Sequence, residues 1–160
     1  MDNLTIRPAR LEDEERLAEI IVAAFGESTI HARREKLYGI LGGITWQQRK
    51  AEEIRNTLRS RPDCVWVAEL NGKIVGFVTY ILHDGELGEI GNNAVDPAFQ
   101  GRGIGKALYK HVLNLMREKG CRYVEVETGL DEAYAAARAA YEKVGFRPLF
   151  QSIRYTMKLK

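Results

Sequence analysis

The sequence contains few residues of the kinds that bind metals or act as thiol nucleophiles. Its two cysteines, Cys64 and Cys121, could form one disulfide but lack the spacing of a metal site, and its three histidines are scattered. Each cysteine lies beside an apolar pattern typical of a strand, where a small, half-buried thiol is the expected role. We therefore expect free cysteines, no bound metal, and a chemistry that uses no cysteine nucleophile.

The chain also lacks long apolar runs and an excess of charge of one sign. No run approaches the roughly 18 residues that a membrane-spanning helix requires, and the first residues, Met1–Leu4, do not resemble a signal peptide. Its 24 basic and 22 acidic residues are interspersed, so the basic surface of a nucleic-acid-binding protein is not expected. These absences predict a cytoplasmic protein that binds neither membranes nor nucleic acids.

What the sequence does contain is a series of helix and strand patterns in a chain of the length of one domain. We expect residues 1–160 to form a single domain with its own core. Apolar residues at helical spacing predict helices, and alternating or continuous apolar runs predict strands. The predicted helices span about residues 12–25, 45–60, 104–119 and 132–143, and the predicted strands span 4–7, 64–70, 73–82, 86–95, 123–127 and 152–158.

Two hairpins join three of these strands, with turns at Asn71-Gly72 and Asp84-Gly85. The segment 27–45 is punctuated by glycines and gives no clear pattern. The expected fold is α+β, with a mixed, mostly antiparallel sheet flanked by helices.

A glycine-rich turn between the strand at 86–95 and the helix at 104–119 is the most informative feature of the chain. It consists of Gln100-Gly101-Arg102-Gly103-Ile104-Gly105-Lys106. Glycines allow several backbone N–H groups to converge on a ligand, and the helix that begins there adds the positive end of its dipole. The turn is not a P-loop, because Ala107 stands where Ser or Thr is required, and its glycine spacing does not fit a dinucleotide fold. A pyrophosphate is the ligand that this turn favours.

Three segments together resemble the GCN5-related N-acetyltransferase (GNAT) superfamily. They are residues 93–97, the turn with residues 100–108, and Tyr141-Glu142-Lys143-Val144-Gly145-Phe146, and their order and spacing fit over nearly the whole chain. The resemblance implies a GNAT-like six- to seven-stranded sheet flanked by about four helices. It also implies an N-acetyltransferase that uses acetyl-CoA as cosubstrate and no metal.

The resemblance assigns two groups of residues to the cosubstrate. The pantetheine arm is expected to bind along the strand backbone like an added strand, at Asn93, Ala94 and Val95. The pyrophosphate is expected at the turn, at Gln100, Gly101, Arg102, Gly103, Ile104, Gly105 and Lys106.

In this superfamily a primary amine attacks the thioester directly in a ternary complex, without an acyl-enzyme. The resemblance places the catalytic base at Glu89, six residues before Val95, and the oxyanion at the backbone N–H of Asn93. Tyr141 matches the tyrosine that lies near the coenzyme sulfur in many members, and a phenol with a pKa near ~10 can protonate the leaving thiolate. Glu86, Glu127 and an ordered water chain remain alternative bases.

One position departs from the superfamily pattern. Tyr134 stands where many members have an asparagine that contacts the pantetheine arm, so that contact is in doubt. Arg138, four residues later on the same predicted helix, could instead reach the phosphates.

The acceptor is the part of the function that the sequence defines least. A small amine, an amino acid, or a peptide or protein N-terminus is expected, because the basic segment 29–50 disfavours a polycationic acceptor. A CoA-binding regulatory module that has lost catalysis is the alternative function. Homodimers are common in the superfamily and the last predicted strand offers an edge, but no residue fixes the oligomer.

Overall fold

The computed structural model describes residues 3–160, and its centre is one sheet of five strands in the order β1-β2-β3-β4-β5. The first four strands are antiparallel neighbours, whereas the last runs parallel to the fourth. The mixed, mostly antiparallel α+β architecture is therefore confirmed, but the expectation of six to seven strands is wrong for residues 3–160. The strands are β1 (Leu4–Pro8), β2 (Val65–Leu70), β3 (Lys73–Leu82), β4 (Leu87–Val95) and β5 (Tyr123–Val126).

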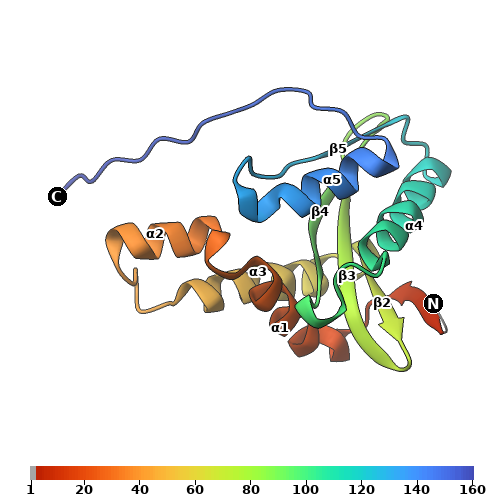
Figure 1. Ribbon diagram of the computed structural model, residues 1–160, viewed down its shortest axis with the longest axis horizontal. Helices are drawn as coiled ribbons and strands as arrows, with labels where there is room; N and C mark the ends of the chain where they lie inside the picture. Colours follow the sequence, from red (N-terminus) through yellow and green to blue (C-terminus); the bar gives the residue numbers. More distant parts are fainter. Residues whose placement is uncertain (1–2) are drawn as a thin grey trace.

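Within residues 3–160, five α-helices accompany the sheet, one more than the approximate number expected (Figure 1). The additional helix is α2 (Ile30–Tyr38), within the segment that gave no clear pattern. Its sequence is mostly polar, so it has no apolar stripe to reveal it, and it begins where the Thr29 hydroxyl accepts a hydrogen bond from the backbone N–H of Ala32. The others are α1 (Glu14–Phe25), α3 (Trp46–Ser60), α4 (Ile104–Glu118) and α5 (Ala135–Val144).

Two apolar layers fix the position of β4. The layer against α1 and α3 contains Leu17, Ile54 and Phe77, and the layer against α4 contains Val78, Leu108 and Met116, all fully buried. Burial of each such side chain contributes about 1.5–3 kcal/mol. Side chains of a strand point to both faces of the sheet, so β4 presents polar side chains to two different environments.

The strand predicted at residues 152–158 is not present in the structure. Residues 146–160 form no regular secondary structure and run as an extended tail away from the end of α5 (Figure 1). The alternation of apolar and polar residues was read correctly from the sequence, but a strand also needs a neighbour for its backbone hydrogen bonds. Within residues 3–160 the tail has no such neighbour.

Candidate functional site

The candidate site is centred on the second half of β4, where the strand separates from β5. The two strands pair only from Leu87 to Ile90, so one edge of β4 beyond Ile90 has no strand partner within residues 3–160. The register with β3 shifts at the same place, opposite Thr79. Gly91 is required there, because a Cβ at this position would lie 2.6 Å from the Thr79 hydroxyl. The bulge thus leaves backbone groups of β4 available to an extended ligand.

The glycine-rich turn follows directly and has the predicted cradle geometry. Gly101 and Gly103 have φ angles of +76° and +78°, which residues with a Cβ rarely adopt. Gly103 is the N-cap of α4 and provides no side-chain cap, so the first N–H groups of this 15-residue helix have no partner from a capping side chain. Gly105 has an ordinary φ, and a Cβ at this position would make ordinary contacts with Val95 (3.8 Å) and Tyr109 (3.9 Å). The turn is therefore a concentration of unsatisfied N–H groups at the positive end of a helix dipole.

Side chains around the turn hold its shape. The Gln100 amide donates to the backbone carbonyl of Val95 (3.1 Å), and the Arg102 guanidinium lies 5.2 Å from the centre of the Phe99 ring. Lys106 instead contributes to a groove of about 380 Å³ between α4 and α5, whose other basic side chains are Lys110, Arg117 and Lys143. Gln100 and Arg102 thus support the turn, whereas Lys106 adds positive charge beside it.

On one face of β4, the Asn93 side chain is held by two phenols. Its Oδ1 accepts a hydrogen bond from the Tyr109 hydroxyl (2.7 Å), and its Nδ2 donates to the Tyr141 hydroxyl (3.0 Å) and the Gly91 carbonyl (3.0 Å). The two rings lie 5.1 Å apart, and both residues are buried. Burial raises the pKa of both phenols above the ordinary value, so each stays protonated at neutral pH. Asn93 and Tyr141 were both predicted as site residues, and the structure brings them into contact.

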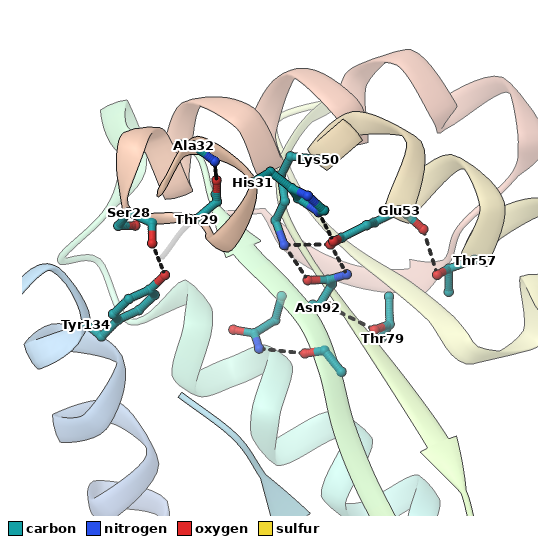
Figure 2. Close-up of polar contacts among 12 residues, drawn as sticks. Ser28, Thr29, His31, Ala32, Lys50, Glu53, Thr57, Thr79, Asn92 and Tyr134 are labelled. Carbon is teal, nitrogen blue, oxygen red and sulfur yellow. Dashed lines mark hydrogen bonds and ion pairs between the residues drawn. The ribbon is translucent and has the colours of Figure 1, made fainter. Parts of the chain in front are cut away.

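On the other face of β4, the Asn92 side chain joins a charged cluster that the sequence did not reveal (Figure 2). Its Nδ2 donates to Glu53 (3.1 Å) and its Oδ1 accepts from the Lys50 ammonium (3.0 Å), which also donates to Glu53 (2.7 Å). The His31 ring lies 2.6 Å from the other oxygen of Glu53, and the Thr79 hydroxyl donates to the Asn92 carbonyl (2.9 Å). We call Lys50, Glu53, His31 and Asn92 the α3 cluster.

The charges of the α3 cluster compensate one another. Burial alone would raise the pKa of the Glu53 carboxyl, but hydrogen bonds from Lys50 and His31 outweigh it and hold that pKa below its ordinary value. The Lys50 ammonium also lies 4.3 Å from the centre of the Phe25 ring. The only hint in the sequence was the i,i+3 spacing of Lys50 and Glu53 on one predicted helix.

The predicted base, Glu89, does not lie with Tyr141. Ile90 is buried in the α4 layer, so the neighbouring Glu89 points to the opposite face of the sheet. There its carboxylate is 2.7 Å from the His83 ring, and both side chains are partly exposed. Of the alternatives, Glu86 precedes β4 and pairs with Arg122 (3.1 Å), and Glu127 follows β5 in an exposed position.

Tyr134 and Arg138 hold loops beside the site. The Tyr134 hydroxyl donates to the backbone carbonyl of Ser28 (2.9 Å; Figure 2), which joins the start of α5 to the segment before α2. Arg138 donates to the backbone carbonyls of Gly129 (2.7 Å) and Asp131 (2.8 Å). Both side chains thus brace the β5–α5 loop.

Residues 3–160 contain neither a metal-binding cluster nor a membrane-spanning helix. No group of three or more His, Cys, Asp and Glu side chains is arranged to hold a metal ion. No helix in this range combines the length and the apolarity needed to cross a membrane.

Comparison with known proteins assigns the family. Residues 24–146, most of the chain, match the family model described as "Acetyltransferase (GNAT) family". The chain belongs to the GNAT family. This range contains the β4 bulge, the glycine-rich turn and Tyr141, so the resemblance found in three short segments extends over the whole site.

Similar proteins illustrate the range of the family. The chain is 36% identical over 95 residues to N-acetylaspartate synthetase from Rattus norvegicus, covering 59% of this chain and 31% of that protein. It is 33% identical over 96 residues to mycothiol acetyltransferase from Beutenbergia cavernae, covering 59% and 32%. The chain thus spans about a third of the length of these relatives.

A solved structure shows the same fold. The GNAT family acetyltransferase from Brucella melitensis, determined in complex with acetyl-CoA, has a TM-score of 0.64 against this chain. It is 22% identical, and the comparison covers 100% of this chain and 93% of that one. The two proteins therefore share the same fold.

Proposed function

We propose that this GNAT protein is an acetyl-CoA-dependent N-acetyltransferase that forms one domain over residues 1–160, acts in the cytoplasm, and transfers acetyl directly to a primary amine. One observation carries the proposal: the uncapped start of α4, with left-handed glycines at 101 and 103, directly follows a strand with a free edge. These two features match a pyrophosphate and an extended amide-bearing arm in the order in which CoA presents them.

The residues of the turn and of β4 have distinct tasks in this proposal. The N–H groups of Gly101 to Lys106 bind the pyrophosphate, and the Lys106 side chain adds charge. The backbone of Asn93, Ala94 and Val95 binds the pantetheine arm, and the N–H of Asn93 polarises the thioester carbonyl.

The reaction needs one proton removed and one supplied. The acceptor nitrogen forms a bond to the acetyl carbon, the carbon–sulfur bond breaks, and the ammonium proton passes to a base. Tyr141 protonates the thiolate, and its hydrogen bond from Asn93 holds the phenol in place. Burial raises the pKa of the phenol, so the Tyr141 hydroxyl carries its proton when the thiolate forms.

Glu89 remains the proposed base, and its contact with His83 supports an acid–base role. Because Glu89 faces away from Tyr141, the proton is removed on one face of β4 and supplied on the other. Glu86, Glu127 and ordered water are the alternative bases. Glu86 is the less favoured of the two glutamates, because its carboxylate forms an ion pair with Arg122.

The proposed acceptor is a small amine, an amino acid or a peptide N-terminus. Helix α2 presents Arg33, Arg34 and Lys36 with a single acid, Glu35. Such a basic segment suits an acceptor that carries a carboxylate better than a polycation. The name of the relative N-acetylaspartate synthetase agrees with an amino-acid acceptor.

A calorimetric titration with acetyl-CoA tests the proposal. Wild type should bind, and Gly103→Glu, which puts a negative side chain into the cradle, should not. Gly85→Glu is the matched control, because Gly85 has a φ of +79° and lies in the exposed β3–β4 turn. Equal binding by wild type and Gly103→Glu would contradict the cradle. Binding without transfer to any amine would favour the regulatory CoA-binding module instead.

A further inference from the structure

His31 and Glu53 form a pair beside the β4 bulge, on the α3 side of the sheet. The His31 Nε2 atom lies 2.6 Å from the Glu53 carboxylate, and the two side chains are 16% and 33% exposed. Figure 2 shows His31, Lys50 and Asn92 gathered around this carboxylate. Asn92, whose amide is 3.1 Å from Glu53, directly precedes Asn93. The pair therefore lies next to the backbone N–H that is proposed to polarise the thioester.

The ionisation of Glu53 decides which nitrogen of His31 carries the proton. Burial opposes this ionisation, but hydrogen bonds from Lys50 and His31 outweigh it and hold the pKa of the carboxyl below its ordinary value. A carboxylate can only accept hydrogen bonds, so the Nε2 atom of His31 is the donor. In the neutral imidazole the free lone pair is then on Nδ1. This is the arrangement of a base oriented by a third group.

The Nδ1 atom of His31 is accessible to a substrate. Within residues 3–160 it has no hydrogen-bond partner, and it is not sealed from solvent. From α3, the charged groups on this side are Glu53, which contacts the ring, and Lys50, which contacts Glu53. On α2 itself, Arg34 and Glu35 follow one turn later, and Glu35 accepts a hydrogen bond from the start of α3. The ring thus has one nitrogen engaged and one open.

Contacts around the first turn of α2 hold His31 in position. The hydroxyl of Thr29, a buried residue, accepts a hydrogen bond from the N–H of Ala32. The Tyr134 hydroxyl donates to the carbonyl of Ser28, three residues before His31 (Figure 2). The start of α2 is therefore tied to α5 as well as to α3, and such support is what a precisely placed functional side chain requires.

A primary amine needs a base before it can attack. An alkylamine with a pKa of about 10 arrives as an ammonium, which has no lone pair. It has to lose one proton first, in addition to the proton that passes to Glu89 once the nitrogen–carbon bond has formed. We propose that His31, oriented by Glu53, removes this first proton, a role that rests on the proposed N-acetyltransferase function and places the acceptor against the α3 cluster.

The step is balanced by groups of this cluster and by water. The Nδ1 lone pair of His31 binds one ammonium proton, and the electrons of the broken N–H bond remain on the amine nitrogen as its lone pair. The imidazolium keeps its hydrogen bond to the Glu53 carboxylate, which stabilises the added charge. Solvent at Nδ1 then takes the proton. An acceptor that is already neutral in solution does not need this step.

Kinetics with two amines of similar shape test the proposal. Ethylamine is an ammonium at neutral pH, whereas trifluoroethylamine is largely neutral. His31→Gln keeps a donor for Glu53 but has no basic nitrogen, so it should lower kcat/KM for ethylamine about 10²-fold and leave that for trifluoroethylamine within about twofold of wild type. The deficit for ethylamine should shrink as the pH is raised, because more of the amine is then free. Acetyl-CoA affinity, measured by calorimetry, should not change.

NMR of the histidine side chains tests the pair without catalysis. The ¹H–¹⁵N signals of His31, identified by their absence in His31→Gln, should be those of the tautomer protonated on Nε2. Protonation on Nδ1 would overturn the proposal, and so would equal effects of His31→Gln on the two amines, which a purely structural role predicts. Acetyl-CoA binding by wild type without transfer to either amine or to L-aspartate would instead contradict the proposed N-acetyltransferase function itself.

Discussion

Asn92 and Asn93 are neighbours on β4 with identical side chains, yet their surroundings differ completely. Asn93 lies between two neutral phenols in the α4 layer, whereas Asn92 lies between an ammonium and a carboxylate from α3. Both amides use donor and acceptor atoms, so both anchor the β4 bulge to helices on opposite sides of the sheet. One side of the bulge thus holds neutral, protonated hydroxyls, and the other holds compensated charges in a fixed arrangement.

The largest effect expected from any of these variants is the loss of turnover when the Tyr141 hydroxyl is removed. In the proposed mechanism, Tyr141→Phe lowers turnover by about 10²- to 10⁴-fold, the usual contribution of a general acid, and leaves acetyl-CoA affinity nearly unchanged. Steady-state kinetics with calorimetric binding measures both. Tyr109→Phe is the control, because it removes the other hydroxyl on Asn93 and should reduce turnover far less. Full turnover by Tyr141→Phe would remove this residue from the acid role.

Loss of the ammonium on the Asn92 side should affect folding instead. Lys50→Met keeps an apolar side chain near Phe25 but leaves Glu53 without its nearest cation, so we expect a loss of about 2–3 kcal/mol in the free energy of unfolding. Urea denaturation provides the measurement. The double variant Lys50→Met/Glu53→Gln should recover part of the loss, because no charge then remains unpaired. A single variant as stable as wild type would show that the α3 cluster does not anchor the bulge.

The dependence of the free energy of unfolding on pH, below neutral pH, should also distinguish the surroundings of Asn92 from those of Asn93. The folded-state pKa of Glu53 is depressed, so its contribution is present above the unfolded pKa and is lost as the pH falls through the folded pKa. Glu53→Gln should therefore lose less stability than wild type between pH 7 and pH 3. Tyr141→Phe should keep the wild-type pH dependence, because the Asn93 side has no carboxyl. Parallel profiles for Glu53→Gln and wild type would contradict this assignment.

A methyl group at Gly101 should have the smallest effect. Gly101→Ala meets no atom within 4 Å, so its cost arises from the φ of +76° alone, about 1 kcal/mol of stability. Since the backbone N–H groups remain, acetyl-CoA affinity should fall by less than tenfold. Thermal unfolding with and without acetyl-CoA measures both the stability and the acetyl-CoA affinity of the variant. A complete loss of binding would mean that the turn tolerates no strain.

The features that the sequence predicted are those with a local signal. The turn at 100–106 could be recognised because its positive φ angles require glycine, and the helix at 45–60 because its apolar residues recur at the right period. The structure places both as expected. The turn Asn71-Gly72 likewise has the positive φ values, +52° and +76°, of a two-residue hairpin.

The features that were missed depend on contacts between distant residues. Glu53 and Asn92 are 39 positions apart, and neither has an unusual neighbour that would indicate their hydrogen bond. Tyr109 lies in the predicted helix as one more buried ring, and only the fold shows its hydroxyl on Asn93. The strand expected at 152–158 was wrong because alternation specifies only a face, whereas a strand also needs a backbone partner, and within residues 3–160 the tail has none.

The measurement that tests the central claim most directly is a two-dimensional NMR titration of the ¹⁵N-labelled protein with acetyl-CoA. The claim is that the edge of β4 and the start of α4 form one continuous binding site. It predicts that the largest shifts fall on the amides of residues 93–95 and 101–106, with smaller shifts in the α3 cluster. Saturable binding with its largest shifts elsewhere, or no shifts at all, would contradict the account.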